Sequence, residues 1–139
     1  MAIRQLSAFV PNEAGALAEI TEIFYRNGID LRAITVYDTS EYGIVRCIVD
    51  DADRAIVLLQ AEGVVSKISE VAAIDPADEP GSLARVFKLF GDHKINIDYI
   101  YSFVVRKNDS QYFVFKVDNI SKAEDLLREN GIKVIESLA

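Results

Sequence analysis

Two short segments of the chain combine a polar residue, a glycine and a leucine at the same spacing. They read Asn12-Glu13-Ala14-Gly15-Ala16-Leu17 and Asp78-Glu79-Pro80-Gly81-Ser82-Leu83. A glycine in such a turn lets the backbone approach a ligand closely, and a helix that starts there offers unpaired N–H groups, which suit a carboxylate. Asn12, Asp78 and, from the strand after each helix, Asp30 or Asp98 are acceptors for an ammonium group. The pattern predicts an amino-acid site, although the same residues also suit a tight turn and a helix cap.

Residues for catalysis are scarce, because the chain has one His and one Cys. Nucleophilic catalysis needs a base beside Ser, Cys or Thr, yet His93 falls in a polar turn and is expected to be solvated. Cys47 falls on the core face of a strand, where a free Cys behaves as a small hydrophobe. One His and one Cys do not close a zinc site without carboxylates or a second chain. We therefore expect no enzyme, no cofactor and no metal.

The composition is that of a folded, acidic protein of 139 residues, with 15 Lys+Arg against 22 Asp+Glu. No apolar stretch approaches the roughly 20 residues that span a bilayer, and the N-terminus lacks the pattern of an export signal. A net charge of −7 argues against binding to phosphate backbones. The sequence predicts a cytoplasmic protein that binds neither membrane nor nucleic acid.

The chain is a tandem repeat. The glycine segments lie 66 positions apart, and the same offset pairs Phe24 with Phe90 and Ile29 with Ile95. Past the middle of each copy the offset becomes 68, as in Gly63 and Gly131. The second copy therefore carries two extra residues in a turn. We place the first domain at residues 1–68 and the second at residues 69–139.

Each copy is predicted to form a strand, a helix, two strands, a helix and a strand. The first helix starts after Gly15 or Gly81 and ends near Asn27-Gly28 or His93-Lys94, because apolar residues recur there at helical spacing. The second helix starts near Asp53 or Ser121, the latter a suitable N-cap, and ends at Gly63 or Gly131. The predicted strands are 29–37, 43–50 and 65–68 in the first copy, and 95–106, 111–118 and 133–136 in the second.

This element order predicts an α+β fold of two tandem ferredoxin-like βαββαβ units, antiparallel sheets with helices on one face. Val45, Cys47 and Val49 should lie under the helices of the first unit, with Phe113, Phe115 and Val117 in the second. The opposite face of the second unit should carry Ile97, Tyr99, Tyr101 and Phe103 on alternate residues. A strip this apolar needs a cover, so we expect the sheets to meet another sheet. That sheet can belong to the same chain or to a second copy, and we favour a homodimer.

These residues resemble the ACT domain family, the small-molecule sensing modules of amino-acid metabolism. The resemblance rests on the turn Asp78–Leu83, on its first copy with Ala14 in place of proline, and on Asn27-Gly28-Ile29-Asp30-Leu31 and His93-Lys94-Ile95-Asn96-Ile97-Asp98. It implies regulatory binding of a free amino acid at an interface between two such domains, with an enzyme of amino-acid biosynthesis as a further partner. It places the ligand by the turn and the start of the next strand, at the residues Asn12, Glu13, Ala14, Gly15, Ala16, Leu17, Asp30, Leu31, Asp78, Glu79, Pro80, Gly81, Ser82, Leu83, Ile97 and Asp98.

Other functions remain as alternatives. An RNA-recognition domain shares the strand order, but it needs a basic surface and a basic-Gly-aromatic motif that this chain lacks. The main competitor is a structural module that pairs with a partner enzyme and binds no small ligand. The sequence does not identify the amino acid. We expect Gly131 to lie on the far side of the fold from the turn at Gly81.

Overall fold

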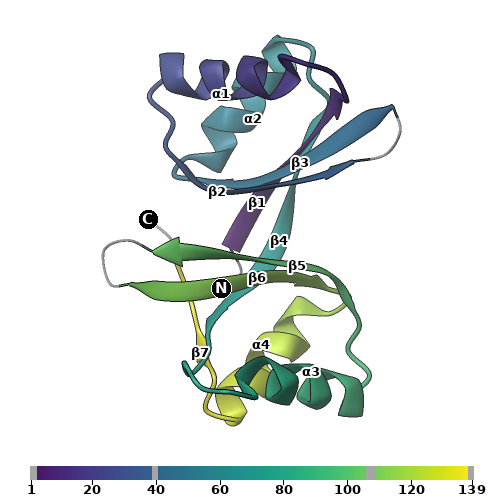
Figure 1. Ribbon diagram of the computed structural model, residues 1–139, viewed down its shortest axis with the longest axis vertical. Coiled ribbons are helices and arrows are strands. Elements are labelled where there is room, and N and C mark those ends of the chain that lie inside the picture. The colour runs from purple at the N-terminus through teal and green to yellow at the C-terminus, as the bar shows by residue number, and fades with distance from the viewer. Residues whose placement is uncertain (1–2, 39–40, 106–108, 138–139) are drawn as a thin grey trace. The chain divides into compact units, whose positions relative to one another are not determined.

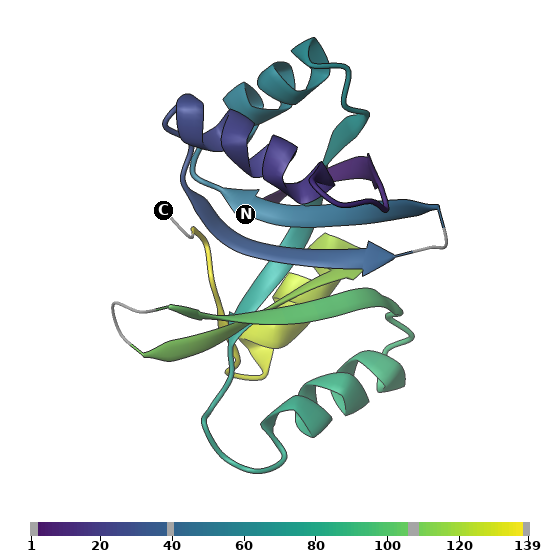
Figure 2. The same cartoon turned by 45° about the horizontal axis from the view of Figure 1, so that its top comes forward.

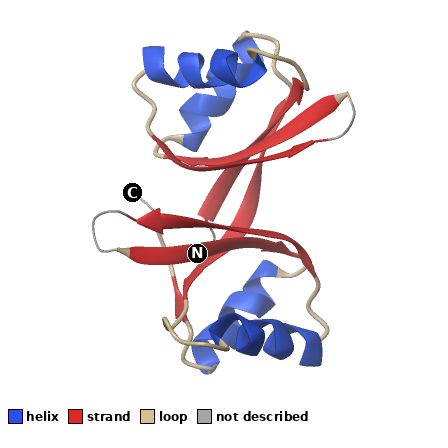
Figure 3. Cartoon of the chain, viewed as in Figure 1, coloured by secondary structure: helices blue, strands red, loops and turns tan. Residues whose placement is uncertain are grey.

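The computed structural model describes residues 3–38, 41–105 and 109–137. They fall into an N-terminal unit, Arg4–Ser69, and a C-terminal unit, Glu70–Ser137 together with Ile3. Figure 1 shows the elements by label and Figure 3 by type. Residue 106 of the predicted strand 95–106 lies outside the described residues. So do residues 39–40 and 106–108 of the two predicted hairpin loops.

The N-terminal unit has the predicted element order. Its elements are β1 (Ile3–Pro11), α1 (Ala16–Arg26), β2 (Leu31–Asp38), β3 (Tyr42–Val49), α2 (Ala52–Ala61) and the first part of β4 (Ser66–Asp75). The strand order is β2-β3-β1-β4, and β1 and β2 both pair antiparallel with β3. This is the ferredoxin-like arrangement.

The C-terminal unit repeats that arrangement. It uses the rest of β4, α3 (Ser82–Asp92), β5 (Ile97–Val105), β6 (Ser110–Val117), α4 (Ile120–Glu129) and β7 (Lys133–Val134). The order is β5-β6-β4, with β7 also paired to β4. The strand predicted to close the first unit at residue 68 instead continues to Asp75, because the apolar run 71–74 extends it as the first strand of the second unit.

Both helices of each unit pack on one face of its strands, as Figure 2 shows in a turned view. The N-terminal core joins α1 and α2 to β1 and β3 through buried side chains that include Phe24, Leu59 and Cys47. The C-terminal core joins α3 and α4 to β4 and β6 through Phe90 and Phe115 among others. The predicted inward face of β3 and β6 is therefore confirmed.

The predicted strip on the second sheet is wrong in one residue. The pairing of β5 with β6 shifts register between Ile97 and Tyr99, so Ile97 lies opposite Val117 and packs against the core on the helix face. Tyr99 lies opposite Lys116 on the other face. A β-bulge places one extra residue in a strand and reverses the alternation beyond it. An equivalent irregularity lies between Leu31 and Ala33 in β2.

The second helices start within one residue of the predicted positions, but the N-cap of α4 is not the predicted Ser121. Asp51 and Asn119 cap α2 and α4, and their side chains accept hydrogen bonds from the N–H groups of Arg54 and Lys122. Asp53 and Ser121 lie inside the first turn. A carboxylate or amide two residues earlier reaches the N3 amide, which is the geometry of an N-cap.

Candidate functional site

The turn before the first helix has the same backbone hydrogen bonds in both units. In the C-terminal unit the N–H of Glu79 donates to Ala77 O at 2.9 Å, and the N–H of Ser82 donates to Glu79 O at 3.3 Å. In the N-terminal unit Glu13 N–H donates to Pro11 O at 2.9 Å and Ala16 N–H to Glu13 O at 3.3 Å. The two copies of the motif therefore fold into the same turn.

A glycine in the left-handed region ends each turn. Gly15 has φ 91° and Gly81 has φ 90°, and each is the N-cap of its helix with no side chain to cap it. A Cβ at either position would have no neighbouring atom within 4 Å. The helix start is consequently left to another hydrogen-bond acceptor, which is the feature that suits a ligand carboxylate.

The two turns differ in their side chains. Ser82 occupies the position of Ala16, and its hydroxyl lies within hydrogen-bond distance of the carbonyl oxygens of Ala77 and Glu79, the latter at 3.1 Å. Pro80 occupies the position of Ala14. The C-terminal turn therefore has two restraints on its conformation that the N-terminal turn lacks.

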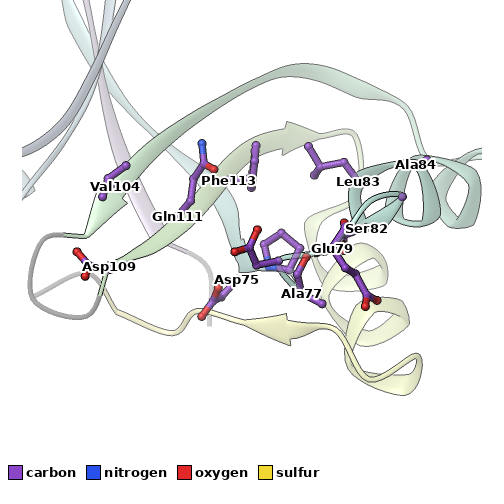
Figure 4. Close-up of a pocket in the computed structure, with 13 residues that line it drawn as sticks. Asp75, Ala77, Glu79, Ser82, Leu83, Ala84, Val104, Asp109, Gln111 and Phe113 are labelled. Carbon is purple, nitrogen blue, oxygen red and sulfur yellow. Dashed lines mark hydrogen bonds between the residues drawn. The ribbon is translucent and has the colours of Figure 1, made fainter.

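A cavity of about 540 Å³ lies beside the C-terminal turn (Figure 4). The turn contributes the predicted residues Asp78, Glu79, Gly81, Ser82 and Leu83. The rest of the lining comes from the end of β4 and the loop after it, from α3 and from the β5–β6 hairpin, namely Asp75, Pro76, Ala77, Ala84, Val104, Asp109, Gln111 and Phe113. Pro80 lines a neighbouring cavity instead.

Among the residues that the structure describes, the charged side chains that line this cavity are carboxylates, from Asp75, Asp78, Glu79 and Asp109. The Lys133 ammonium lies 3.9 Å from the Asp75 carboxylate but belongs to the neighbouring cavity. Gln111 and Ser82 add neutral polar groups, while Leu83, Val104 and Phe113 supply apolar surface. The lining therefore combines acceptors for an ammonium group with a helix start for a carboxylate and apolar contacts for a side chain.

A second cavity, of about 470 Å³, lies beside the same turn and shares part of its lining with the first. It is lined by Gly81 and Ser82 and also by Arg85, Gly131 and Lys133. Arg85 connects the two helices here, because its guanidinium donates to Asn130 O at 2.7 Å. The expectation that Gly131 lies far from the turn is therefore wrong: the end of α4 packs beside the start of α3.

The strand-start residues of the predicted site lie elsewhere in each unit. Ile97 pairs with Val117, whereas the turn follows β4 at the end of the sheet where Ile74 pairs with Phe113. The eleven residues of α3 separate these ends by about 16 Å. Within the C-terminal unit the structure does not bring Asp98 to the turn.

The two strand-start aspartates, Asp98 and Asp30, have partners close by in their own units. The Asp98 carboxylate accepts a hydrogen bond from the Asn96 side chain at 3.1 Å and lies 3.9 Å from the Lys116 ammonium. In the N-terminal unit, Leu31 pairs with Val49 at the corresponding end of the sheet, and Asp30 forms an ion pair with Arg32 at 3.0 Å.

His93 and Cys47, the residues considered for catalysis, make contacts within the fold. His93 follows α3, and its Nδ1 lies 2.9 Å from Leu89 O. Cys47 is buried in the N-terminal core, and burial raises the pKa of its thiol to about 12. In residues 3–38, 41–105 and 109–137, no group of three or more His, Cys, Asp or Glu side chains is placed to hold a metal ion. No helix in the described parts of the chain has the length and apolar character needed to cross a membrane.

Sequence reasoning missed several cavity residues. Asp75 ends β4, and Val104, Asp109 and Gln111 belong to the β5–β6 hairpin. Val104, Asp109 and Gln111 are distant from the turn in sequence, and the antiparallel pairing of β4 with β6 and of β6 with β5 brings them to it. The predicted β5–β6 hairpin was the signal in the sequence that could have found them, because its strands meet the turn at the same end of the sheet.

Comparison with known proteins gives a family match and similar solved structures. The family model for the ACT domain pair matches residues 1–138. No match is found among curated proteins. The solved structure of protein BT0572 from Bacteroides thetaiotaomicron is 31% identical, with a TM-score of 0.89 over 97% of this chain and 92% of that one.

Two further solved structures share the fold at lower identity. They are the regulatory subunits of aspartate kinase from Thermus thermophilus and Thermus flavus, each 19% identical, with TM-scores of 0.68 and 0.65. The first alignment covers 94% of this chain and 92% of that one, and the second covers 92% and 90%. With the family model matched over almost the whole sequence and both units folded as ferredoxin-like βαββαβ, the chain belongs to the ACT domain pair family.

Proposed function

We propose that this chain is a regulatory module that binds a free amino acid beside the turn of its C-terminal unit. The observation that carries the proposal is the cavity of about 540 Å³ that five predicted turn residues line. In this pose the ligand carboxylate accepts hydrogen bonds from N–H groups at the start of α3, where Gly81 provides no cap. The ammonium group lies against the carboxylates of Asp78 and its neighbours.

The cavity is compatible with an amino acid in size and chemistry. Its volume is in the range of small-molecule sites, and it offers both apolar and polar contacts. Ser82 and Pro80 restrain the turn before ligand arrives, which reduces the entropy lost on binding. The N-terminal turn has the same backbone but Asn12 in place of Asp78, so we expect it to bind an ammonium group more weakly.

The proposed role is regulation of an enzyme of amino-acid metabolism. Regulatory subunits of aspartate kinase have this fold, and the chain covers 92% and 90% of the two compared above. Ligand binding would change the affinity of the module for its partner enzyme, and the partner would change ligand affinity by the same factor. Association of the module with itself as a homodimer is part of the same proposal.

Thermal denaturation of the purified chain with each of the twenty amino acids tests this function. A ligand at one hundred times its dissociation constant stabilises the folded state by about 2.7 kcal/mol, which raises the melting temperature by several degrees. Asp78→Asn makes the C-terminal turn resemble the N-terminal one and should weaken this response. Asp92→Asn, at the other end of α3, is the matched control and should keep it.

The outcomes separate the two candidate functions. A stabilising amino acid whose effect weakens in Asp78→Asn but not in Asp92→Asn supports the site at the turn. Equal responses in both variants place the ligand elsewhere. If none of the twenty amino acids stabilises the wild-type chain, the structural module that pairs with an enzyme without a small ligand becomes the better account.

A further inference from the structure

Two asparagine–glycine dipeptides occur in the sequence, Asn27-Gly28 and Asn130-Gly131. This dipeptide is prone to spontaneous deamidation, because the glycine nitrogen can attack the side-chain carbonyl carbon of the asparagine. Glycine has no Cβ to hinder the approach, and its backbone samples many conformations. Asn27 is the C-cap of α1, and Asn130 is the C-cap of α4. The conformations of these two helix ends therefore decide whether the reaction occurs in the folded chain.

The reaction needs only water. The Gly131 nitrogen loses its proton to hydroxide and forms a bond to Cγ of Asn130. The bond from Cγ to Nδ2 breaks, and the amide nitrogen takes a proton from water and leaves as ammonia. The product is a cyclic imide. Water then opens the imide at either carbonyl, which gives aspartate or isoaspartate at position 130, so the chain gains a negative charge and no atom is oxidised or reduced.

The folded structure holds the reacting groups of Asn130-Gly131 apart. The Asn130 side-chain nitrogen donates to Leu126 O at 2.8 Å, and the Gly131 N–H donates to Arg128 O at 3.1 Å. With ψ of 13° at Asn130, the Gly131 nitrogen is nearly eclipsed with the Asn130 nitrogen and turned away from Cβ. Ring closure therefore requires both hydrogen bonds to break and the Cα–C bond to rotate, which is a local opening of the end of α4.

The other dipeptide has nearly the same geometry. The ψ angle of Asn27 is 10°, and its side-chain nitrogen donates to Ile23 O at 2.7 Å. The Gly28 N–H donates to Tyr25 O at 3.3 Å. Asn27-Gly28 is therefore an internal reference, because the same dipeptide has the same cap on a helix of the other unit.

Asn130 has a further restraint that comes from another helix. The Arg85 guanidinium, on α3, donates from Nη2 to Asn130 O at 2.7 Å. This oxygen belongs to the same planar peptide group as the Gly131 nitrogen, so neither atom can turn about the Cα–C bond without the other. The hydrogen bond from Arg85 consequently opposes the rotation that ring closure requires.

We propose that Asn130-Gly131 is a site of spontaneous deamidation in the folded chain, and that Arg85 slows the reaction by holding the Asn130 peptide group in place. Asn130 is an exposed residue, so water reaches it. Helix ends open locally at a lower free energy than the core of a unit. Arg85 is a positioning residue, because it restrains a rotation and does not touch the reacting atoms. The proposal does not depend on the amino-acid site.

The modification changes the end of α4 and the wall of the cavity of about 470 Å³, which Gly131 and Arg85 both line. A carboxylate at position 130 replaces the Nδ2 donor by an acceptor that faces Leu126 O. Negative charge is also unfavourable at the C-terminus of a helix. Isoaspartate in addition lengthens the main chain by one methylene. We expect either product to weaken the contact between the end of α4 and the start of α3.

Peptide mapping of the full-length chain tests the proposal. Trypsin cleaves after Lys and Arg and so separates the two dipeptides into the peptides 27–32 and 129–133. The folded and the urea-denatured chain are incubated in mildly alkaline buffer, and mass spectrometry measures the deamidated fraction of each peptide. Both peptides should deamidate in the folded chain, more slowly than in the denatured one. The peptide 129–133 should give both aspartate and isoaspartate, which chromatography separates.

The variant Arg85→Ala removes the restraint on Asn130 and leaves Asn27 as it is. In the folded variant, deamidation of the peptide 129–133 should become about two- to tenfold faster, the effect of losing one exposed hydrogen bond. The rate for the peptide 27–32 should not change. Lys88→Ala, about one turn further along α3, is the matched control and should change neither rate.

Three results would contradict the proposal. If the peptide 129–133 deamidates only after denaturation, the folded chain has no such site. If Arg85→Ala accelerates both peptides alike, the arginine acts on the stability of the whole chain and not on the Asn130 peptide group. Aspartate without isoaspartate would show direct hydrolysis of the side chain in place of ring closure. The comparison of folded and denatured wild type needs no variant.

Discussion

The two units of this chain form the same turn with different side chains. Both turns have the same backbone hydrogen bonds and a glycine near φ 90°. Around that backbone the N-terminal unit has Asn12, Ala14 and Ala16, whereas the C-terminal unit has Asp78, Pro80 and Ser82. The glycine and the main chain determine the geometry, and the side chains are left to determine charge and rigidity. The C-terminal turn is the more restrained and the more acidic.

The cores of the two units differ in their aromatic content at the position of Phe115. Phe115 packs its ring against Phe90 with centroids 5.4 Å apart, and the equivalent of Phe115 in the N-terminal unit is Cys47. We expect Phe90→Ala and Phe24→Ala each to lower the free energy of unfolding by about 3–5 kcal/mol. The loss should be larger for Phe90 by about 0.5–1.5 kcal/mol, because only Phe90 has the aromatic partner.

Urea denaturation followed by circular dichroism measures both losses. In a Phe115→Cys background the second unit has the same pair of residues as the first, so the excess loss for Phe90→Ala should disappear. An excess that persists in that background would show that the ring pair is not its cause.

The sequence predicted the helix starts because glycine and apolar spacing are local signals. It missed the bulge between Ile97 and Tyr99, since a bulge changes which face a residue occupies without changing the residue pattern. The sequence predicted Asp98 beside the turn, but α3 separates the two. The order of motifs along a sequence does not say at which end of the sheet each motif lies. Val104 and Gln111 were missed because strand register, not local sequence, brings them to the cavity.

The cysteine gives the N-terminal unit a dependence on alkaline pH. Burial raises the pKa of the Cys47 thiol to about 12, whereas an unfolded thiol ionises near pH 8.5. Above that pH the unfolded chain loses a proton that the folded chain keeps, so stability falls as pH rises. The expected slope is about 1.4 kcal/mol per pH unit until the pH reaches the folded pKa.

We compare the unfolding free energies of wild type and Cys47→Ala between about pH 9 and pH 11. The difference isolates the contribution of the Cys47 thiol, because the other titrating groups cancel. The stability advantage of wild type over the variant should shrink across that range. A constant difference would mean that the thiol ionises alike in the folded and unfolded chains.

The ends of the first helices offer a smaller contrast. Lys94 has φ 58° where the N-terminal unit has Gly28 at φ 67°. A lysine in this region has a steric cost that glycine avoids, partly offset by the greater flexibility of glycine when unfolded. Lys94→Gly should therefore stabilise the chain by about 0.5–1 kcal/mol, and Gly28→Lys should destabilise it similarly. Thermal denaturation measures both, and a destabilised Lys94→Gly would refute the explanation.

The smallest expected effect concerns the proline of the turn. Since both turns have the same hydrogen bonds, Ala14→Pro should fit the N-terminal turn and stabilise it by about 0.4–1 kcal/mol through the unfolded state. Pro80→Ala should cost a similar amount. Opposite signs of nearly equal size in chemical denaturation are the expected result, and a destabilising Ala14→Pro would show that the backbones differ at this residue.

The most direct test of the amino-acid site compares Gly81→Ala with Gly15→Ala by thermal denaturation, with and without the stabilising amino acid. Both glycines have φ near 90° and open space at the Cβ position, so the two variants should lose similar stability without ligand. Only Gly81 lines the cavity of about 540 Å³. We predict that the ligand-induced rise in melting temperature disappears in Gly81→Ala and survives in Gly15→Ala. An equal rise in both variants, or none in wild type, would contradict a ligand site at the C-terminal turn.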